Sequence, residues 1–94
     1  MVKEDVIRDI IRHITICGQS SNQWCVGRSD KEDFVFNQHN VIQNSDMWIV
    51  RKLDTNEDAK KAKEYLVDKL DLIDSKNETG SLVFVYLRND HTKP

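Results

Sequence analysis

The segment SLVFVYLR, residues 81–88, decides the fold of this chain. Its positions from Leu82 to Leu87 are all apolar and lack the alternation of a strand that has one face in water. A strand of this kind is buried on both faces, so we expect it at the centre of a sheet with helices on either side. The rest of the chain must then supply neighbouring strands and apolar helix faces.

Two other short apolar runs supply the neighbouring strands. Residues 23–28 form a short run that reaches a glycine, and residues 47–53 (MWIVRKL) alternate, with Trp48 and Val50 on one face. The basic pair near the end of the second run indicates that this strand reaches solvent or a sheet edge. We therefore predict three strands, at residues 23–28, 47–53 and 81–88.

Three segments have the features of helices. Residues 3–15 carry an apolar face from Val6 to Ile14 and a charged opposite face. Residues 30–39 follow a capping-box pair, Ser29 and Glu32.

Residues 56–70 follow a second capping signature that includes Thr55, and they carry an apolar stripe: Ala59, Ala62, Leu66 and Leu70. The predicted fold is a single domain, residues 1–94, of the α/β (α+β) class. It has a small three-stranded sheet flanked by three helices, in the order α-β-α-β-α-β.

Composition limits the function classes. The 94 residues include 14 basic and 16 acidic side chains, a net charge of −2, so the chain lacks the general positive field of non-specific nucleic-acid binders. Cys17 and Cys25 lack C-x-x-C spacing, which favours core thiols in a reduced compartment. No apolar run approaches the roughly 20 residues of a membrane-spanning helix, so we expect a cytoplasmic protein with no membrane partner.

The stretch QWCVGRSDKEDFVFNQHNV, residues 23–41, has the outline of a binding site. A short strand leads through Gly27 into a polar turn and then into a helix that ends at His39 and Asn40. Such a strand-to-helix turn exposes backbone N–H groups and side chains together, and α/β domains often bind ligands there.

With the W-x-x-G pattern of Trp24 to Gly27 and the H-N-V of residues 39–41, the chain resembles GIY-YIG-type nuclease domains. It resembles most a set of compact GIY-YIG-like bacterial and phage proteins, which continue with a Trp-containing strand, an A-x-x-x-x-E helix and a terminal V-x-V-Y strand. Ala59 and Glu64 match the helix pattern, and residues 83–86 match the strand pattern. The resemblance covers about residues 23–88 and implies a GIY-YIG-like fold.

The resemblance also implies roles for individual residues. Trp24 takes the position of the signature tyrosine, His39 that of the polar residue at the helix end, and Glu64 that of the glutamate that holds Mg²⁺ or Mn²⁺. Tyr86 could fill the place of the first signature aromatic residue. Arg28, directly after the signature glycine, could replace the family's phosphate-stabilising arginine.

Two departures from the family pattern point away from catalysis. Lys31, Glu32 and Asp33 stand where the helix arginine is expected, and a carboxylate there would repel phosphate. The first signature strand is missing, and residues 14–16 are a poor substitute for it. The leading expectation is a non-catalytic or nearly inactive GIY-YIG-like domain that acts as a small binding or regulatory protein, possibly from a phage or mobile element, with no cofactor.

Two alternatives remain open. One is an active Mg²⁺- or Mn²⁺-dependent DNA or RNA endonuclease with a rearranged site that uses Arg28 or Arg51. The other is an interaction protein whose acidic turn, Asp30, Glu32 and Asp33, docks on a basic protein surface. The expected partner is therefore nucleic acid or a protein.

Each candidate also has a purely structural interpretation. His39 can interact with the dipole at the end of its helix, and Trp24 and Trp48 can be core aromatics. Glu64 lies away from the apolar stripe of its predicted helix, which is typical of a solvated charge.

Overall fold

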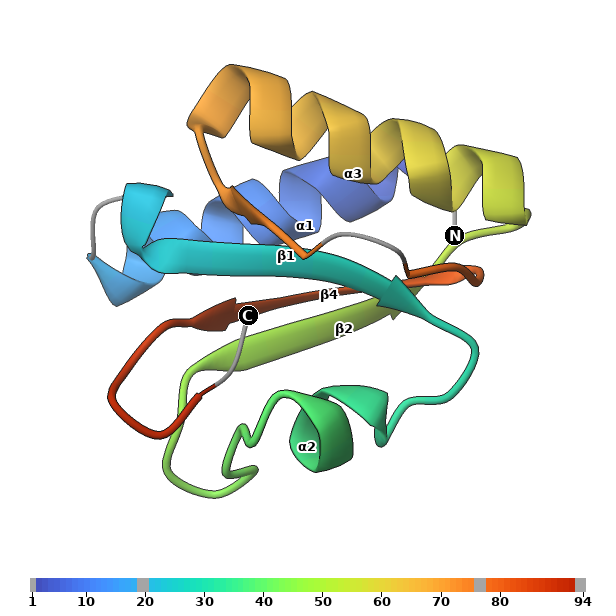
Figure 1. The fold of residues 1–94 in the computed structure, drawn as a ribbon. Coiled ribbons are helices and arrows are strands. Elements are labelled where there is room, and N and C mark those ends of the chain that lie inside the picture. Colours follow the sequence, from blue (N-terminus) through green and yellow to red (C-terminus); the bar gives the residue numbers. More distant parts are fainter. Residues whose placement is uncertain (1, 19–20, 76–77, 93–94) are drawn as a thin grey trace.

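A computed structural model describes residues 2–18, 21–75 and 78–92, so the predicted domain limits at residues 1 and 94 lie outside the described ranges. Within these ranges the fold is a four-stranded sheet with helices on both faces (Figure 1). The elements in chain order are α1 (Lys3–Cys17), a 3-10 turn η1 (Ser21–Gln23), β1 (Trp24–Ser29), α2 (Phe34–Gln38), β2 (Trp48–Lys52), α3 (Asn56–Leu70), β3 (Ile73–Asp74) and β4 (Leu82–Leu87).

The sheet has the strand order β2-β4-β1-β3. Strand β4 pairs antiparallel with β2 on one side and with β1 on the other, which confirms its predicted central position. The predicted number of three strands is wrong, because β3 adds a fourth strand parallel to β1. This strand is only two residues long, and it depends on tertiary contacts that leave no local pattern in the sequence.

Those contacts come from β1 and α3. The Ser75 N–H donates to the carbonyl oxygen of Val26 over 2.9 Å. Lys63 on α3 binds Asp74 Oδ1 at 2.8 Å and also donates to the carbonyl oxygen of Ser75. The lysine therefore holds the short strand against the sheet from the side of α3.

The two faces of the sheet are covered differently. Helices α1 and α3 lie together on one face, and the short helix α2 lies alone on the other (Figure 1). The side chains of alternate residues in β4 point to opposite faces of the sheet. Val83 and Val85 lie in the core under α1 and α3, and Phe84 and Tyr86 lie in the core under α2. The expectation of apolar cover on both faces of this strand is confirmed.

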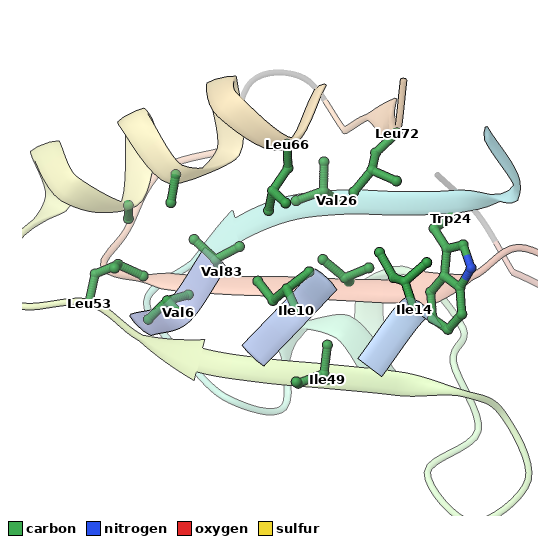
Figure 2. Packing of buried hydrophobic residues seen from close by; sticks show 13 residues of the cluster. Val6, Ile10, Ile14, Trp24, Val26, Ile49, Leu53, Leu66, Leu72 and Val83 are labelled. Atoms are coloured by element: carbon green, nitrogen blue, oxygen red, sulfur yellow. The ribbon is translucent and has the colours of Figure 1, made fainter. Parts of the chain in front are cut away.

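The larger core lies between the sheet and the helix pair. Val6, Ile10 and Ile14 on α1 point at the sheet, and Trp24 closes one end of this layer (Figure 2). Burying these side chains provides the main stabilisation of the fold, at about 25 cal/mol for each Å² of apolar surface removed from water.

The helix boundaries agree with the prediction where caps form. Helix α3 starts after Thr55, whose hydroxyl accepts a hydrogen bond from the Asp58 N–H at 3.0 Å. The predicted capping box at Ser29 is wrong: Ser29 is the last residue of β1, its hydroxyl donates to the Lys31 carbonyl at 2.8 Å, and α2 begins only at Phe34. None of the described helices is long and apolar enough to cross a membrane.

Candidate functional site

A cleft of about 510 Å³ lies where β1 ends and α2 begins, and we call it the α2 cleft. The polar turn after β1 supplies one wall, α2 supplies another, and the residues just before β4 complete it. Its polar lining includes Arg28, Asp30, Lys31, Asp33, Asn37 and Glu78. The predicted binding stretch at residues 23–41 therefore does border a cavity.

A buried chain of hydrogen bonds reaches the α2 cleft from inside the protein, and we call it the His39 network. His39 is only 4% exposed. Its Nδ1 lies 2.9 Å from the Tyr86 hydroxyl, and its Nε2 lies 2.7 Å from Glu78 Oε2. The other carboxylate oxygen, Oε1, accepts a hydrogen bond from the Arg28 backbone N–H at 3.3 Å.

The carboxylate decides how the protons of the His39 network are arranged. An ionised carboxylate only accepts hydrogen bonds, so His39 Nε2 carries the proton and donates it to Glu78. In a neutral ring Nδ1 is then the acceptor of a hydrogen bond from the Tyr86 hydroxyl, whereas in a protonated ring Nδ1 donates to that hydroxyl. Glu78 thus fixes the tautomer of His39, and Tyr86 holds the ring from the other side.

Burial keeps the Tyr86 hydroxyl and the neighbouring Cys25 thiol protonated. It raises the pKa of the Tyr86 hydroxyl well above the ordinary value of 10.0, and a hydrogen bond with Cys25 acts in the same direction. Burial likewise raises the pKa of the Cys25 thiol to about 11. At neutral pH the Tyr86 hydroxyl and the Cys25 thiol are therefore both uncharged.

The local sequence explains how these side chains meet. His39 is the C-cap residue of α2, and Asn40 after it has a φ of 60°, which turns the chain away. Tyr86 reaches the same side because alternate residues of β4 face α2. Gly27 leaves room for the carboxylate, because a Cβ at this position would overlap Glu78 Oε1 and the ring of Phe84.

Arg28 lies at the rim of the site, and its guanidinium group is used by the fold. Its Nη2 donates to the carbonyl oxygens of Gly80 at 3.0 Å and Asn56 at 3.1 Å, and its Nε also donates to Gly80. The side chain therefore ties the end of β1 to the start of α3 and to the residues before β4.

Two of the predicted site residues do not join the His39 network. Trp24 lies on the opposite face of the sheet, in the core under α1 and α3. Its ring and the His13 ring form a T-shaped pair with centroids 5.7 Å apart. Its indole N–H is buried without a hydrogen-bond partner among the described residues. Glu64 is exposed on α3 and lines a second pocket of about 250 Å³, together with Arg28, Lys60 and Lys63.

The structure thus brings together His39 and Tyr86, with Arg28 joined to them through Glu78. The sequence reasoning missed Glu78. This residue lies in a polar run between α3 and β4, and its partner His39 is 39 residues away along the chain, so no local spacing links the two. The useful signal was indirect: a glycine at position 27 on a buried strand indicates that another group approaches the backbone closely.

Among the described residues, no group of three or more His, Cys, Asp or Glu side chains is placed to hold a metal ion. No family model matches the chain, and comparison with curated proteins and with solved structures also finds no match.

Proposed function

We propose that this chain is a GIY-YIG-like domain without phosphodiesterase activity, which binds a protein partner in the α2 cleft. The observation that carries the proposal is the His39 network. Both ring nitrogens of His39 and both carboxylate oxygens of Glu78 already have partners within the protein. A general base must instead offer its lone pair to the substrate, so this arrangement supports a structural role for His39 beneath a binding cleft.

The charges of the cleft favour a protein over a nucleic acid. Asp30, Asp33 and Glu78 line the cleft and would repel phosphates. Of the two cations that line the cleft within the described ranges, Arg28 already donates to backbone carbonyls, which leaves Lys31 as the exposed one. A protein surface that carries both signs of charge fits such a lining better than a polyanion does.

Blocking the cleft tests the proposal. Asn37 is exposed at the cleft, and Asn37→Trp would fill part of it, whereas Lys61→Trp adds the same bulk to the exposed side of α3. We expect a specific partner protein captured from a host lysate by the wild type and by Lys61→Trp, and lost with Asn37→Trp. Capture that is equal for all three proteins would refute binding through this cleft.

An active endonuclease is the second candidate, and one observation favours it. Arg28 and Glu64 line the same second pocket, where Lys60 and Lys63 add positive charge. Arg51, the other candidate arginine, is instead bound to Asp9 on α1, at 3.3 Å.

Cleavage assays separate the two functions. We expect no hydrolysis of DNA or RNA by the wild type with Mg²⁺ or Mn²⁺. Cleavage that disappears with Glu64→Ala and persists with Glu57→Ala, an exposed glutamate in the first turn of the same helix, would overturn the binding proposal and establish the nuclease.

A further inference from the structure

The carboxylate of Glu78 lies in a cradle that other parts of the chain build. His39 Nε2 at the end of α2 donates to one oxygen, and the Arg28 N–H of β1 donates to the other. Gly27 provides the space, and the side chain of Glu78 is only 11% exposed.

The two donors of the cradle are positioned by parts of the chain other than Glu78. The Arg28 N–H is fixed by the pairing of β1 with β4, in which Arg28 lies opposite Val83. The His39 ring is held by the Tyr86 hydroxyl and packs against the Phe84 ring, with ring centroids 4.9 Å apart. A preorganised pair of donors of this kind binds an anionic group with little loss of conformational freedom.

We propose that Glu78 is an internal occupant of a carboxylate-binding site, and that a carboxylate of the protein partner takes its place when the partner fills the α2 cleft. The partner's carboxylate is an Asp or Glu side chain or a chain terminus. This inference rests on the proposed function and names the group that the partner inserts. In this exchange the Glu78 side chain leaves the cradle and turns into the cleft, whose lining also includes Lys31.

The charge balance favours a carboxylate over a phosphate. Among the residues that the structure describes, the charged side chains that line the cleft are Arg28 and Lys31 on one side and Asp30, Asp33 and Glu78 on the other. A carboxylate that replaces Glu78 in the cradle brings one negative charge and two oxygens for two donors. A phosphate brings a third oxygen without a donor and, as a dianion, a further negative charge beside Asp30 and Asp33.

Removing the internal occupant tests this site directly. In Glu78→Ala, sodium acetate should produce a saturable shift of the Arg28 amide signal in NMR spectra, measured against sodium chloride at equal ionic strength. The wild type should show no such shift, because Glu78 competes for the cradle. Adding His39→Gln to Glu78→Ala should weaken acetate binding by about tenfold to a hundredfold, as expected for the loss of a hydrogen bond to a charged group.

The outcomes separate the possibilities. Acetate that does not bind to folded Glu78→Ala overturns the inference, and inorganic phosphate that binds more tightly than acetate overturns the assignment to a carboxylate. If Glu78→Ala does not fold, Glu78→Gln provides the test, because acetate should displace the neutral amide and shift its side-chain signals. If acetate binds but Asn37→Trp does not change capture of the partner, the carboxylate site is supported and the proposed function is refuted. If Asn37→Trp abolishes capture but acetate does not bind, the proposed function is supported and the carboxylate site is refuted.

Discussion

Gly27 controls the candidate site although it has no side chain. A Cβ there would overlap both Glu78 Oε1 and the Phe84 ring. Glu78 belongs to the His39 network, and Phe84 belongs to the core under α2. The absence of a side chain on β1 therefore allows a carboxylate to reach the backbone of a buried strand.

Gly27→Ala should lower the free energy of unfolding by about 1–3 kcal/mol, because the added methyl group overpacks the site. Urea denaturation measures this. Part of the cost should disappear when Glu78→Ala is also present, since one of the overlapping atoms is then gone. An equal cost of Gly27→Ala in both backgrounds would contradict the predicted contact.

Cys25 makes stability depend on alkaline pH. Burial raises the pKa of its thiol from 9.0 to about 11, so the folded state favours the protonated form. Its contribution to stability is complete below pH 9 and is lost as the pH rises towards 11. Tyr86, whose pKa is also raised, adds to the same loss.

The substitution Cys25→Val removes the titrating thiol. The free energy of unfolding of this variant should therefore fall less steeply between pH 9 and pH 11 than that of the wild type. Urea denaturation across this range measures the two slopes. Cys25→Val also removes the hydrogen bond that helps to raise the pKa of Tyr86, so the difference reports on the Cys25–Tyr86 pair. Parallel curves would show that Cys25 does not titrate differently in the folded state.

At the scale of single residues, the sequence identified part of the site. His39 and Tyr86 were selected from motifs, and they do form a hydrogen bond although 47 residues separate them. Trp24 and Glu64, selected in the same way, lie elsewhere. Glu78 could not be selected, because its importance comes from contacts with β1 and α2 that only the fold creates.

Among the elements, β2 lies at an edge of the sheet. The Leu87 N–H donates to the Met47 carbonyl, and the Leu53 N–H donates to the Ser81 carbonyl. In this antiparallel register the backbone N–H and C=O groups of odd-numbered residues in β2 point towards β4, and those of even-numbered residues point away from the sheet. The outward carbonyl of Val50 accepts a hydrogen bond from Arg51 Nη1 at 2.9 Å. Arg51 thereby covers part of an edge that another strand could otherwise pair with.

Arg51→Ala should therefore increase self-association through β2. Sedimentation velocity over a range of protein concentrations measures this. Lys60→Ala is the matched control, because it removes the same charge from an exposed position on α3. A variant that associates no more than this control would show that Arg51 does not protect the edge.

Local signals predicted most of the elements. The limits of α3 agree with the predicted residues 56–70 because Thr55 caps the helix and Ala59, Ala62 and Leu66 form its buried stripe. The start of α2 was predicted too early because Ser29 belongs to the strand pairing, where it lies opposite Leu82. Strand β3 was missed because two residues are too few to show any periodicity.

For the molecule as a whole, Asn89 and His91 connect the segment after β4 to the loop before β2. Asp46 receives hydrogen bonds from the Ile42 N–H at 2.7 Å, Asn89 Nδ2 at 3.0 Å and His91 Nε2 at 2.6 Å. Burial alone would raise the pKa of Asp46, but these hydrogen bonds outweigh it and hold the pKa below 3.8. The carboxylate therefore stabilises the fold above that pH, and this stabilisation is lost as the pH falls through the lowered value.

Ending the chain after Arg88 should lower the free energy of unfolding at neutral pH by about 1–3 kcal/mol, because Asp46 loses two of its partners. The shortened chain should also lose less stability than the full chain between pH 7 and pH 3. Urea denaturation at both pH values measures this difference. Equal losses in the two chains would show that the tail does not affect the ionisation of Asp46.

The division of the core by the sheet gives each side its own fluorescent reporter. Trp24 is fully buried in the core under α1 and α3. Trp48 lies on the α2 side, where its ring centroid is 4.9 Å from that of Phe36 and its indole N–H donates to the Gln43 carbonyl. Replacing either tryptophan with phenylalanine would leave one reporter for one layer. In stopped-flow refolding, the order in which the two emission changes occur would reveal which layer assembles first and whether the candidate site forms together with the larger core or after it.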